Sequence, residues 1–457
     1  MSVTSSHLIT DPIPKLLRTL AIPAALGFFF NTMYNVVDTW VAGQITGEAL
    51  AALSLSFPVF FILIAIGMGM GSGMTALIST ELGANDKAKA AEYAAQSISF
   101  GFILAIILSI LGYFLSPTLF QLLGASDSYL TTALSYMQPV FIGSIFLSMT
   151  FILNAILNAL GDTVSYRNVL IVSFFINLIV SPWLAFGLLG VPALGILGIA
   201  LATIITNLIG VIYLTYKVRT ANLINWSCLR CNFVPKWNVI KDILVQGLPA
   251  SFTMMTVALG AFIITYFVSK FGAEAVAGYG TALRVEQMVL IPSIGINIAV
   301  LTLIGQNKGA KRLDRVKETL RIGFRYTLYI STFATIFILL FSEYFMEFFT
   351  EDKTIIAYGM GYLSITALIT WAYGIIFVTD SALRGLKRPM FPLAIGVLRQ
   401  IILPLPLFWL VTVVLKPDVV GIWWAIFAIV WISALLSWWY LNRIVKTLIP
   451  ATISNTK

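Results

Sequence analysis

The sequence has 457 residues, of which 59% are hydrophobic and only 10% are charged. A soluble domain carries about 25% charged residues, so the composition excludes a water-soluble protein of this length. It also excludes an outer-membrane β-barrel, whose strands alternate apolar and polar residues over about ten positions, because this chain has long apolar runs that suit membrane helices of ~20 residues.

The apolar runs predict an all-α polytopic membrane protein with twelve transmembrane helices. In chain order they are expected at residues 15–42, 51–80, 93–116, 130–159, 164–188, 193–217, 238–268, 276–306, 317–342, 355–384, 389–414 and 419–446. The polar start, MSVTSSHLITD, lacks the apolar core and cleavage site of a signal peptide, so we expect the first helix to be retained and His7 to lie in a solvated tail.

The net charge of +9 invites a nucleic-acid partner, but the positions of lysine and arginine argue against one. Nearly all of them fall in loops on the side of the amino terminus. The opposite loops hold only Lys270, Lys353 and Lys416, while Arg284 and Arg399 fall inside predicted helices. By the positive-inside rule, this asymmetry predicts that both termini are cytoplasmic.

The two halves of the chain match each other at a constant offset of 226 residues. Pro23-Ala24 aligns with Pro249-Ala250, and Gly69 aligns with Gly295. Each copy contains six predicted helices, so the sequence predicts two pseudo-symmetric six-helix bundles in parallel orientation. We expect an N-lobe over 1–217, a cytoplasmic linker over 218–237 and a C-lobe over 238–457.

Such a duplication is typical of secondary transporters, in which one half moves against the other. The duplication fits an enzyme poorly. It also fits a receptor or a channel without coupled transport poorly. No Walker motif, nucleophile triad or metal-ligand cluster is seen, so we expect no enzyme activity and no cofactor, and an ion gradient as the energy source. The glycines of IGMGMGSG at 66–73 are interpreted as close helix packing, and Cys228 and Cys231 as reduced thiols without a role.

The most unusual polar group is Asp38 in the first helix, whose counterpart in the second half is Ile264. A carboxylate at the centre of a membrane helix costs about 2.5–3.5 kcal/mol. Asn31, Tyr34 and Asn35 precede it at helical spacing and share its face. Either Asp38 is a coupling residue that gains and loses a cation, or it touches water near the outer loop GQITGE.

Polar residues at the same spacing occur in three further helices of the first half. They are Asn154 and Asn158 in the fourth helix, Asn177 and Ser181 in the fifth, and Thr203 and Asn207 in the sixth. Facing a carboxylate, these groups would hydrogen-bond to it or supply oxygen ligands to sodium. The alternative is that the asparagines only hold helices together.

The second half carries different charges. Glu286 is expected to form an internal ion pair with Arg284 or Arg399, and Asp380 an interfacial pair with Arg384. In the first helix, Pro23 removes a backbone hydrogen bond and is either a hinge or a fixed kink. Methionines and aromatic residues that line a central cleft, Met33 among them, would adapt to varied flat apolar molecules.

The motifs IPAALGFFFNTMYNVVDTWVAG in the first helix and ALRGLKRP at the end of the tenth resemble those of the MATE (multidrug and toxic compound extrusion) transporters. An acid well inside the first helix, and none in the seventh beyond Asp242 at its start, make the chain similar to the DinF-like subfamily. The resemblance covers the whole chain. It implies a V-shaped pair of lobes in a bacterial cytoplasmic (inner) membrane, and a monomer surrounded by lipids. The expected activity is export of amphipathic or cationic drug-like compounds by antiport with protons or sodium.

The resemblance also assigns roles to residues of this sequence. Asp38 matches the family's coupling aspartate, and Pro23 matches a proline at which bending has been proposed. Ser181 departs from close relatives that carry a second aspartate, which favours protons over sodium at Asp38 and Asn177. The expected coupling residues are Asp38, Asn177, Asn154, Tyr34, Ser181 and Thr203, and the expected substrate cavity holds Asn31, Met33, Tyr34, Asn35, Asn158 and Asn207.

One alternative function shares this architecture, a flippase for lipid-linked precursors. It would be expected to line its cleft with several basic residues and often to have additional helices. Apart from residues toward the cytoplasmic ends, Arg284 and Arg399 are the only basic residues inside the predicted helices, so the antiporter is the preferred interpretation.

Overall fold

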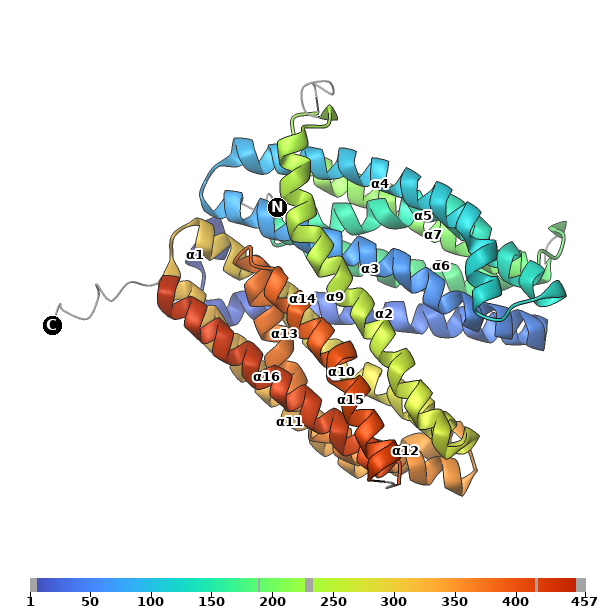
Figure 1. Cartoon of the computed structure of the whole chain (residues 1–457). Coiled ribbons are helices and arrows are strands. Elements are labelled where there is room, and N and C mark those ends of the chain that lie inside the picture. Colours follow the sequence, from blue (N-terminus) through green and yellow to red (C-terminus); the bar gives the residue numbers. More distant parts are fainter. Residues whose placement is uncertain (1–5, 188–189, 227–232, 416–417, 449–457) are drawn as a thin grey trace. The chain divides into compact units, whose positions relative to one another are not determined.

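The computed structural model of the protein describes residues 6–187, 190–226, 233–415 and 418–448. Within these ranges the chain contains helices and no β-strand (Figure 1). The predictions for Cys228, Cys231 and Lys416 concern positions outside the described residues. The first half contains α1 (Ser6–Thr10), α2 (Ile13–Ile45), α3 (Gly47–Gly83), α4 (Lys87–Leu122), α5 (Asp127–Leu160), α6 (Val164–Phe186) and α7 (Ile196–Thr220).

The second half repeats this series of long helices. It contains α9 (Trp237–Val268), η2 (Ser269–Phe271), α10 (Ala273–Gly309), α11 (Leu313–Phe349), α12 (Lys353–Ala367), α13 (Thr370–Gly385), α14 (Met390–Val397), η3 (Leu398–Ile402), α15 (Pro404–Trp409), η4 (Leu410–Val414) and α16 (Val420–Leu448). Eleven described helices are long and apolar enough to cross a membrane, and α12 and α13 make a twelfth span when the pair is counted as one. This agrees with the twelve predicted spans.

Two of the predicted spans are less regular than the sequence suggested. The predicted helix 355–384 is bent by 54° between α12 and α13. The predicted helix 389–414 contains two π-helical segments, η3 and η4. The first lies directly before Pro404, which has no N–H to continue the α-helical pattern. The N–H of Leu403 instead donates to the carbonyl oxygen of Leu398, five residues back, at 2.9 Å.

Local sequence signals account for several helix ends. Thr46 precedes α3, and its side chain accepts from the backbone N–H of Ala49. Asp86 caps α4 in the same way, satisfying an N–H that has no partner within the helix. Gly161 and Gly187 end α5 and α6 in the left-handed conformation, with φ of 85° and 73°, which glycine adopts without steric cost.

The chain divides into two compact units. Unit 1 contains Leu26–Ser251, and unit 2 contains Leu8–Ala25 together with the described residues from Phe252 onward. The divisions fall inside α2 and α9, the first long helix of each repeat. The lobes expected from the sequence divide instead at the loop between residues 217 and 238, and these lobe boundaries stay a prediction.

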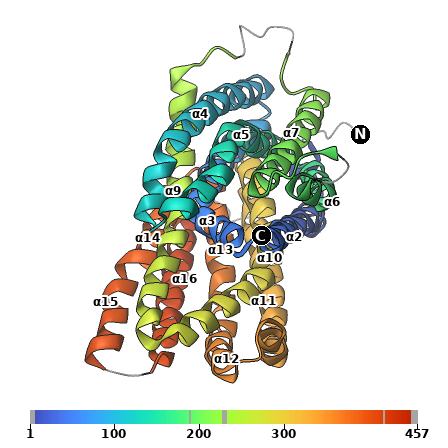
Figure 2. The same ribbon diagram turned by 90° about the vertical axis from the view of Figure 1, so that its right-hand side faces the viewer.

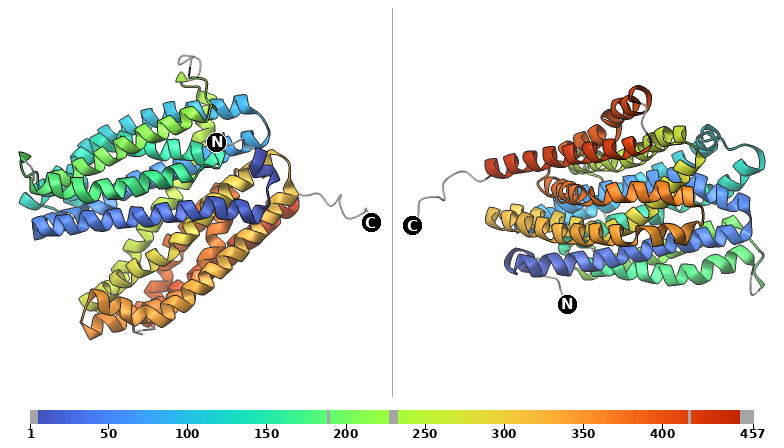
Figure 3. Two further views of the ribbon diagram at one scale, coloured as in Figure 1. Left: turned by 180° about the vertical axis from the view of Figure 1, so that it is seen from behind. Right: turned by 90° about the horizontal axis from the view of Figure 1, so that it is seen from below.

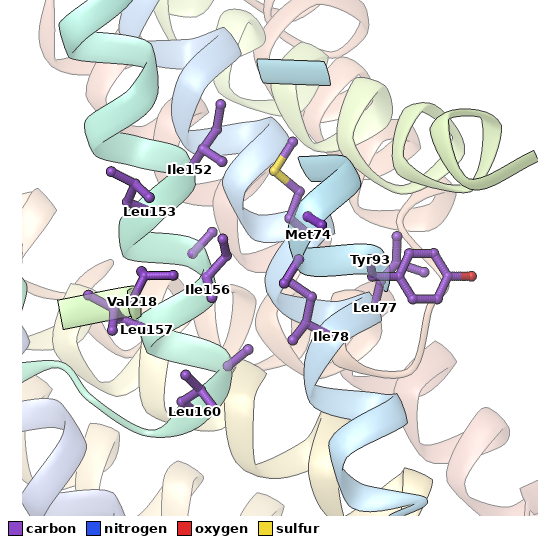
Figure 4. Close-up of a cluster of buried hydrophobic side chains, with 14 of the residues drawn as sticks. Met74, Leu77, Ile78, Tyr93, Ile152, Leu153, Ile156, Leu157, Leu160 and Val218 are labelled. Carbon is purple, nitrogen blue, oxygen red and sulfur yellow. The ribbon is translucent and has the colours of Figure 1, made fainter. Parts of the chain in front are cut away.

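Unit 1 is organised around α5, which packs against α3, α4 and α7, while α6 packs against α7 (Figure 2). Its largest core joins side chains of α3, α4 and α5, and Figure 4 shows Met74, Ile78 and Ile156 pointing toward one another there. A second apolar cluster in the same unit includes Val41 of α2 and Met137 of α5. These cores hold the helices that carry the polar residues of the first half.

Unit 2 is organised around α10, which packs against α11, α12 and α13, while α13 also packs against α16. The beginning of the chain lies against the α10–α11 turn, where the dark blue segment meets the yellow-orange one in Figure 3. Arg315 Nη2 donates to the carbonyl oxygen of Asp11 at 2.7 Å, and Arg312 Nη1 donates to that of Ile9 at 2.5 Å. Leu17 and Leu20 of α2 are buried in this unit's core.

The glycines of IGMGMGSG pack helices closely, as predicted. A side chain at Gly67 would overlap the ring of Phe151 on α5, so this face of α3 meets α5. On the other face, a Cβ at Gly73 would lie 2.6 Å from the backbone nitrogen of Gly247 on α9, and one at Gly69 would overlap the backbone of Ser251. The motif therefore lets α3 approach two neighbouring helices at once.

Candidate functional site

Asp38 lies in unit 1 with only 5% of its surface exposed. Asn177 Nδ2 of α6 donates a hydrogen bond of 2.8 Å to Asp38 Oδ1, and Ser181 Oγ donates one of 3.3 Å to the same oxygen. Asn177 and Ser181 are themselves fully buried. They are four residues apart on α6, so one face of that helix presents both donors to the carboxylate. This is a buried, hydrogen-bonded carboxylate rather than one in open contact with water.

Tyr34 lies one turn before Asp38 on α2 and joins this helix to α7. Its hydroxyl donates to Thr203 Oγ1 at 3.1 Å and lies 3.2 Å from Thr206 Oγ1. Thr203 Oγ1 in turn donates to the carbonyl oxygen of Ile199 at 3.2 Å. Because a phenol group buried without a partner would be costly, these contacts fix the side chain of Tyr34 between α2 and α7.

A cavity of about 110 Å³ opens beside Tyr34 within unit 1. Asn31 and Asn35 of α2 line it, together with Thr203 and Asn207 of α7. Apolar and aromatic side chains form much of the remaining wall: Phe28, Phe60, Ile64, Met68, Leu147, Phe151, Val169 and Leu170. A wall that combines apolar and aromatic side chains with hydrogen-bonding groups is typical of pockets for small organic molecules.

Three of the predicted residues lie elsewhere or contribute differently. Met33 and Asn158 do not line this cavity, although Asn158 is buried. Asn154 is also buried, and its Oδ1 has no hydrogen-bond partner among the described residues. The same holds for Oδ1 of Asn177, whose amide nitrogen binds Asp38. Two buried amide oxygens are thus available as acceptors, the atom type that sodium prefers.

The cavity also contains polar residues that the sequence analysis missed. They are Thr150, Tyr166, Ser173 and Thr206. A signal was available for three of them, because Thr206 follows Thr203 by three residues, Thr150 precedes Asn154 by four, and Ser173 precedes Asn177 by four. Each therefore lies on the face of a residue that was already selected. Tyr166 lies on the same face eleven residues before Asn177, but no selected residue is within one turn of it.

Pro23 lies inside α2, which is a single continuous helix from Ile13 to Ile45. The division between the two units follows Ala25, two residues later. Pro249 lies inside α9, and the other division follows Ser251, again two residues later. Both prolines thus mark the place where a helix passes from one unit to the other.

The ion pairs predicted in the second half form no direct salt bridge among the described residues, although Glu286 interacts electrostatically with Arg399, and Asp380 with Arg384. Glu286 is buried, and its Oε2 accepts a hydrogen bond of 2.6 Å from the hydroxyl of Tyr362. Arg284 is exposed on the same helix, so it faces away from that site. Asp380 and Arg384 are one turn apart on α13, but among the described residues neither takes part in a salt bridge. A tyrosine thus supplies the contact that was expected from an arginine.

The family model described as MatE matches residues 23–183 and 249–410, two ranges that begin 226 residues apart. The "Probable multidrug resistance protein YoeA" of Bacillus subtilis is 26% identical over 441 residues, covering 95% of each chain. A protein named "FAD transporter" from Shewanella oneidensis is 27% identical over 406 residues, covering 88% of each.

Solved structures share the fold over almost the whole chain. An outward-facing multidrug resistance MATE family transporter of the MOP superfamily gives a TM-score of 0.90 at 22% identity, with 98% of both chains covered. A MOP superfamily transporter from Pyrococcus furiosus gives 0.91 at 21% identity, also with 98% of both covered. The two copies of the family model coincide with the internal repeat, and the chain therefore belongs to the MatE family of multidrug and toxic compound extrusion (MATE) transporters.

Proposed function

We propose that the protein is a secondary active transporter that exports amphipathic, often cationic compounds in exchange for protons. Sodium is the alternative coupling ion, and the proposed location is a bacterial cytoplasmic membrane with both termini in the cytoplasm. The observation that carries the proposal is the position of Asp38, a buried carboxylate that accepts hydrogen bonds from Asn177 and Ser181. Membership of a transporter family supports it.

The chemistry of the Asp38 site suits a group that changes its charge. Burial away from water disfavours the ionised carboxylate, whereas hydrogen bonds from Asn177 and Ser181 favour it. These opposing effects leave the balance sensitive to a small change in hydration. A proton that binds when the site is hydrated from one side, and leaves when it is hydrated from the other, would couple the ion gradient to the motion of the lobes.

A sodium ion would use a different set of atoms. The residues that fit it are Asp38, with a carboxylate oxygen, and Asn177, with its buried amide oxygen. Ser181 offers only a hydroxyl at the position where the family resemblance allows a second carboxylate. With one carboxylate in the site, a proton neutralises the charge more simply than a metal ion does, so protons remain the proposed coupling ion.

The substrate pocket is proposed to include the cavity beside Tyr34. Its aromatic and aliphatic wall would contact the apolar part of a substrate, and Asn31, Asn35 and Asn207 would orient polar groups. At about 110 Å³ the cavity is smaller than the ~300 Å³ at the low end for ligand pockets. It would hold one ring of a substrate rather than the whole molecule.

The test is transport in inside-out vesicles that contain the purified protein. Ethidium uptake should fall to background when the proton gradient is collapsed, and it should persist when only the sodium gradient is collapsed. Asp38→Asn should abolish uptake while the protein stays folded in the membrane. Glu343→Gln, which removes an exposed acid on α11, is the matched control and should retain wild-type uptake. Wild-type uptake by Asp38→Asn would remove this residue from the mechanism.

The alternative function is a flippase for lipid-linked precursors. It predicts movement of a labelled precursor lipid between leaflets without a requirement for Asp38. Because one similar protein is named "FAD transporter", FAD is a further substrate to include in the assay. Uptake of ethidium with proton coupling would favour the antiporter over both.

A further inference from the structure

Unit 2 contains a buried arginine, Arg399, that takes no part in the proposed coupling site. Arg399 lies in the π-helical segment η3, and only 8% of its surface is exposed. Its guanidinium group lies over the ring of Tyr373, with 5.6 Å between the guanidinium carbon and the ring centroid. Arginine inside a membrane helix is costly and marks a functional position by default.

Two N–H donors of the Arg399 guanidinium group have no acceptor among the described residues. Nε and Nη1 of Arg399 are buried and have no hydrogen-bond partner among the described residues. Nε of Arg384, on the neighbouring helix α13, is also buried without a hydrogen-bond partner among the described residues. A buried donor without an acceptor costs about 1–3 kcal/mol, and more when it is charged, so a bound group that accepts hydrogen bonds would stabilise these atoms.

The acidic neighbours of Arg399 balance its charge without satisfying its N–H groups. Glu286 and Asp380 both interact electrostatically with it. Oε2 of Glu286 already accepts from Tyr362, and Asp380 also has Arg384 as a charged neighbour one turn away. Among the described residues, Oδ1 of Asp380 is a buried acceptor without a partner, and three buried donors of the two arginines also lack one.

The geometry of the helix that carries Arg399 is itself unusual. The π-helical turn at Leu398–Ile402 widens the helix directly before Pro404, and such bulges are frequent at functional sites. A guanidinium group has only donors, and its planar fork fits carboxylate and phosphate groups better than other acceptors. The aromatic face of Tyr373 holds this fork in place.

We propose that Arg399, assisted by Arg384, binds the carboxylate or phosphate group of an anionic amphipathic compound in unit 2. This inference rests on the proposed function, since it assigns a class of substrate to the same transporter. It extends the substrates from cations to anions, which the site around Asp38 does not address. The two kinds of compound would use different lobes.

The test uses two anionic probes and one cationic probe with the full-length protein in inside-out vesicles. Carboxyfluorescein presents carboxylates, 4-methylumbelliferyl phosphate presents a phosphate, and ethidium is the cation. Arg399→Gln should raise the KM for the preferred anion at least about tenfold, the effect of losing a charged hydrogen bond, and should change the KM for ethidium less than about twofold. Arg399→Lys should restore the affinity only in part, because an ammonium group lacks the planar fork.

Arg284→Gln is the matched control, because it removes an exposed arginine from a helix of the same unit, and it should leave all three KM values unchanged. Equal loss of ethidium and anion transport in Arg399→Gln would show a structural role and overturn the proposal. So would anion transport that survives the change unaltered, or a wild-type protein that neither transports nor saturably binds either anion. Anion binding to the purified protein distinguishes this proposal from the proposed function. Asp38→Asn should still bind the anion. Absence of ethidium transport by the wild type would reject only the proposed function.

Discussion

At the scale of single residues, the environment of Asp38 is created by two side chains of α6. Both donors bind the same carboxylate oxygen, and these hydrogen bonds are stronger to an ionised than to a neutral carboxyl group. Asn177 makes the shorter contact, and its side chain has no other described acceptor for its amide nitrogen. The first prediction therefore concerns this residue.

Replacing Asn177 by leucine should impair transport through loss of coupling more than through loss of fold. The change removes the 2.8 Å hydrogen bond to Asp38 at similar volume. We expect the transport rate in a proton gradient to fall about tenfold or more, the equivalent of ~1.4 kcal/mol. Asn158→Leu, on α5, serves as the comparison. Equal rates in the wild type and in Asn177→Leu would contradict the proposed role.

Replacing Ser181 by aspartate should change the coupling ion. A second carboxylate would then lie beside Asp38, where Ser181 Oγ is 3.3 Å from Oδ1. Two carboxylates repel each other when both are ionised, and a bound cation relieves this repulsion. We expect uptake to become stimulated by a sodium gradient. Ser181→Asn, which adds volume without charge, should not show this stimulation. Uptake by Ser181→Asp that still responds only to the proton gradient would contradict the proposed position of this residue beside Asp38.

At the scale of helices, glycines let neighbouring helices approach closely within each unit. The repeat places Gly69 of α3 and Gly295 of α10 at equivalent positions. A side chain at Gly295 would overlap the carbonyl oxygen of Ala21 on α2, as one at Gly69 would overlap Ser251 on α9. Each repeat thus uses one glycine to receive the first helix of the other repeat.

The surroundings of the glycines predict that a change to alanine has opposite effects on stability at two positions. Gly69→Ala should destabilise the protein by about 1–3 kcal/mol through overpacking against the α9 backbone. Gly280→Ala should be neutral or stabilising by up to about 1 kcal/mol, because nothing lies within 4 Å of its added Cβ and alanine favours helix. Thermal unfolding followed by tryptophan fluorescence measures both. A stable Gly69→Ala variant would show that α3 and α9 can move apart.

The two prolines near the unit boundaries provide a prediction about motion. If Pro23 is a hinge, Pro23→Ala should restore the missing backbone hydrogen bond, stiffen α2 and lower the transport rate several-fold without weakening substrate binding. Pro249→Ala on α9 is the repeat-related comparison. Unchanged transport in Pro23→Ala would identify this proline as a fixed kink.

At the scale of the whole molecule, the distribution of basic residues predicts orientation. The chain has two cysteines, Cys228 and Cys231, both in the loop expected on the cytoplasmic side. A membrane-impermeant maleimide should therefore label the protein in inside-out vesicles and not in intact cells. Replacing both residues by serine gives the background. Labelling in intact cells would reverse the predicted topology.

The sequence by itself determined the class of protein, the number of spans and the duplication. These follow from apolar run length, which the bilayer thickness fixes, and from prolines and glycines repeated at a constant offset. It also selected Asp38 and most of its polar neighbours, because a charge in an apolar helix is expensive and its partners lie at helical spacing.

The tertiary structure decided which of these groups meet. Helices that are apolar on all sides give little information about their rotation, so periodicity could not show that Asn177 and Ser181 face Asp38. Nor could it show that Tyr362 rather than an arginine contacts Glu286, or that Arg399 lies over Tyr373. Such contacts depend on how neighbouring helices pack and on the π-helical turn before Pro404, and these are properties of the assembled bundle.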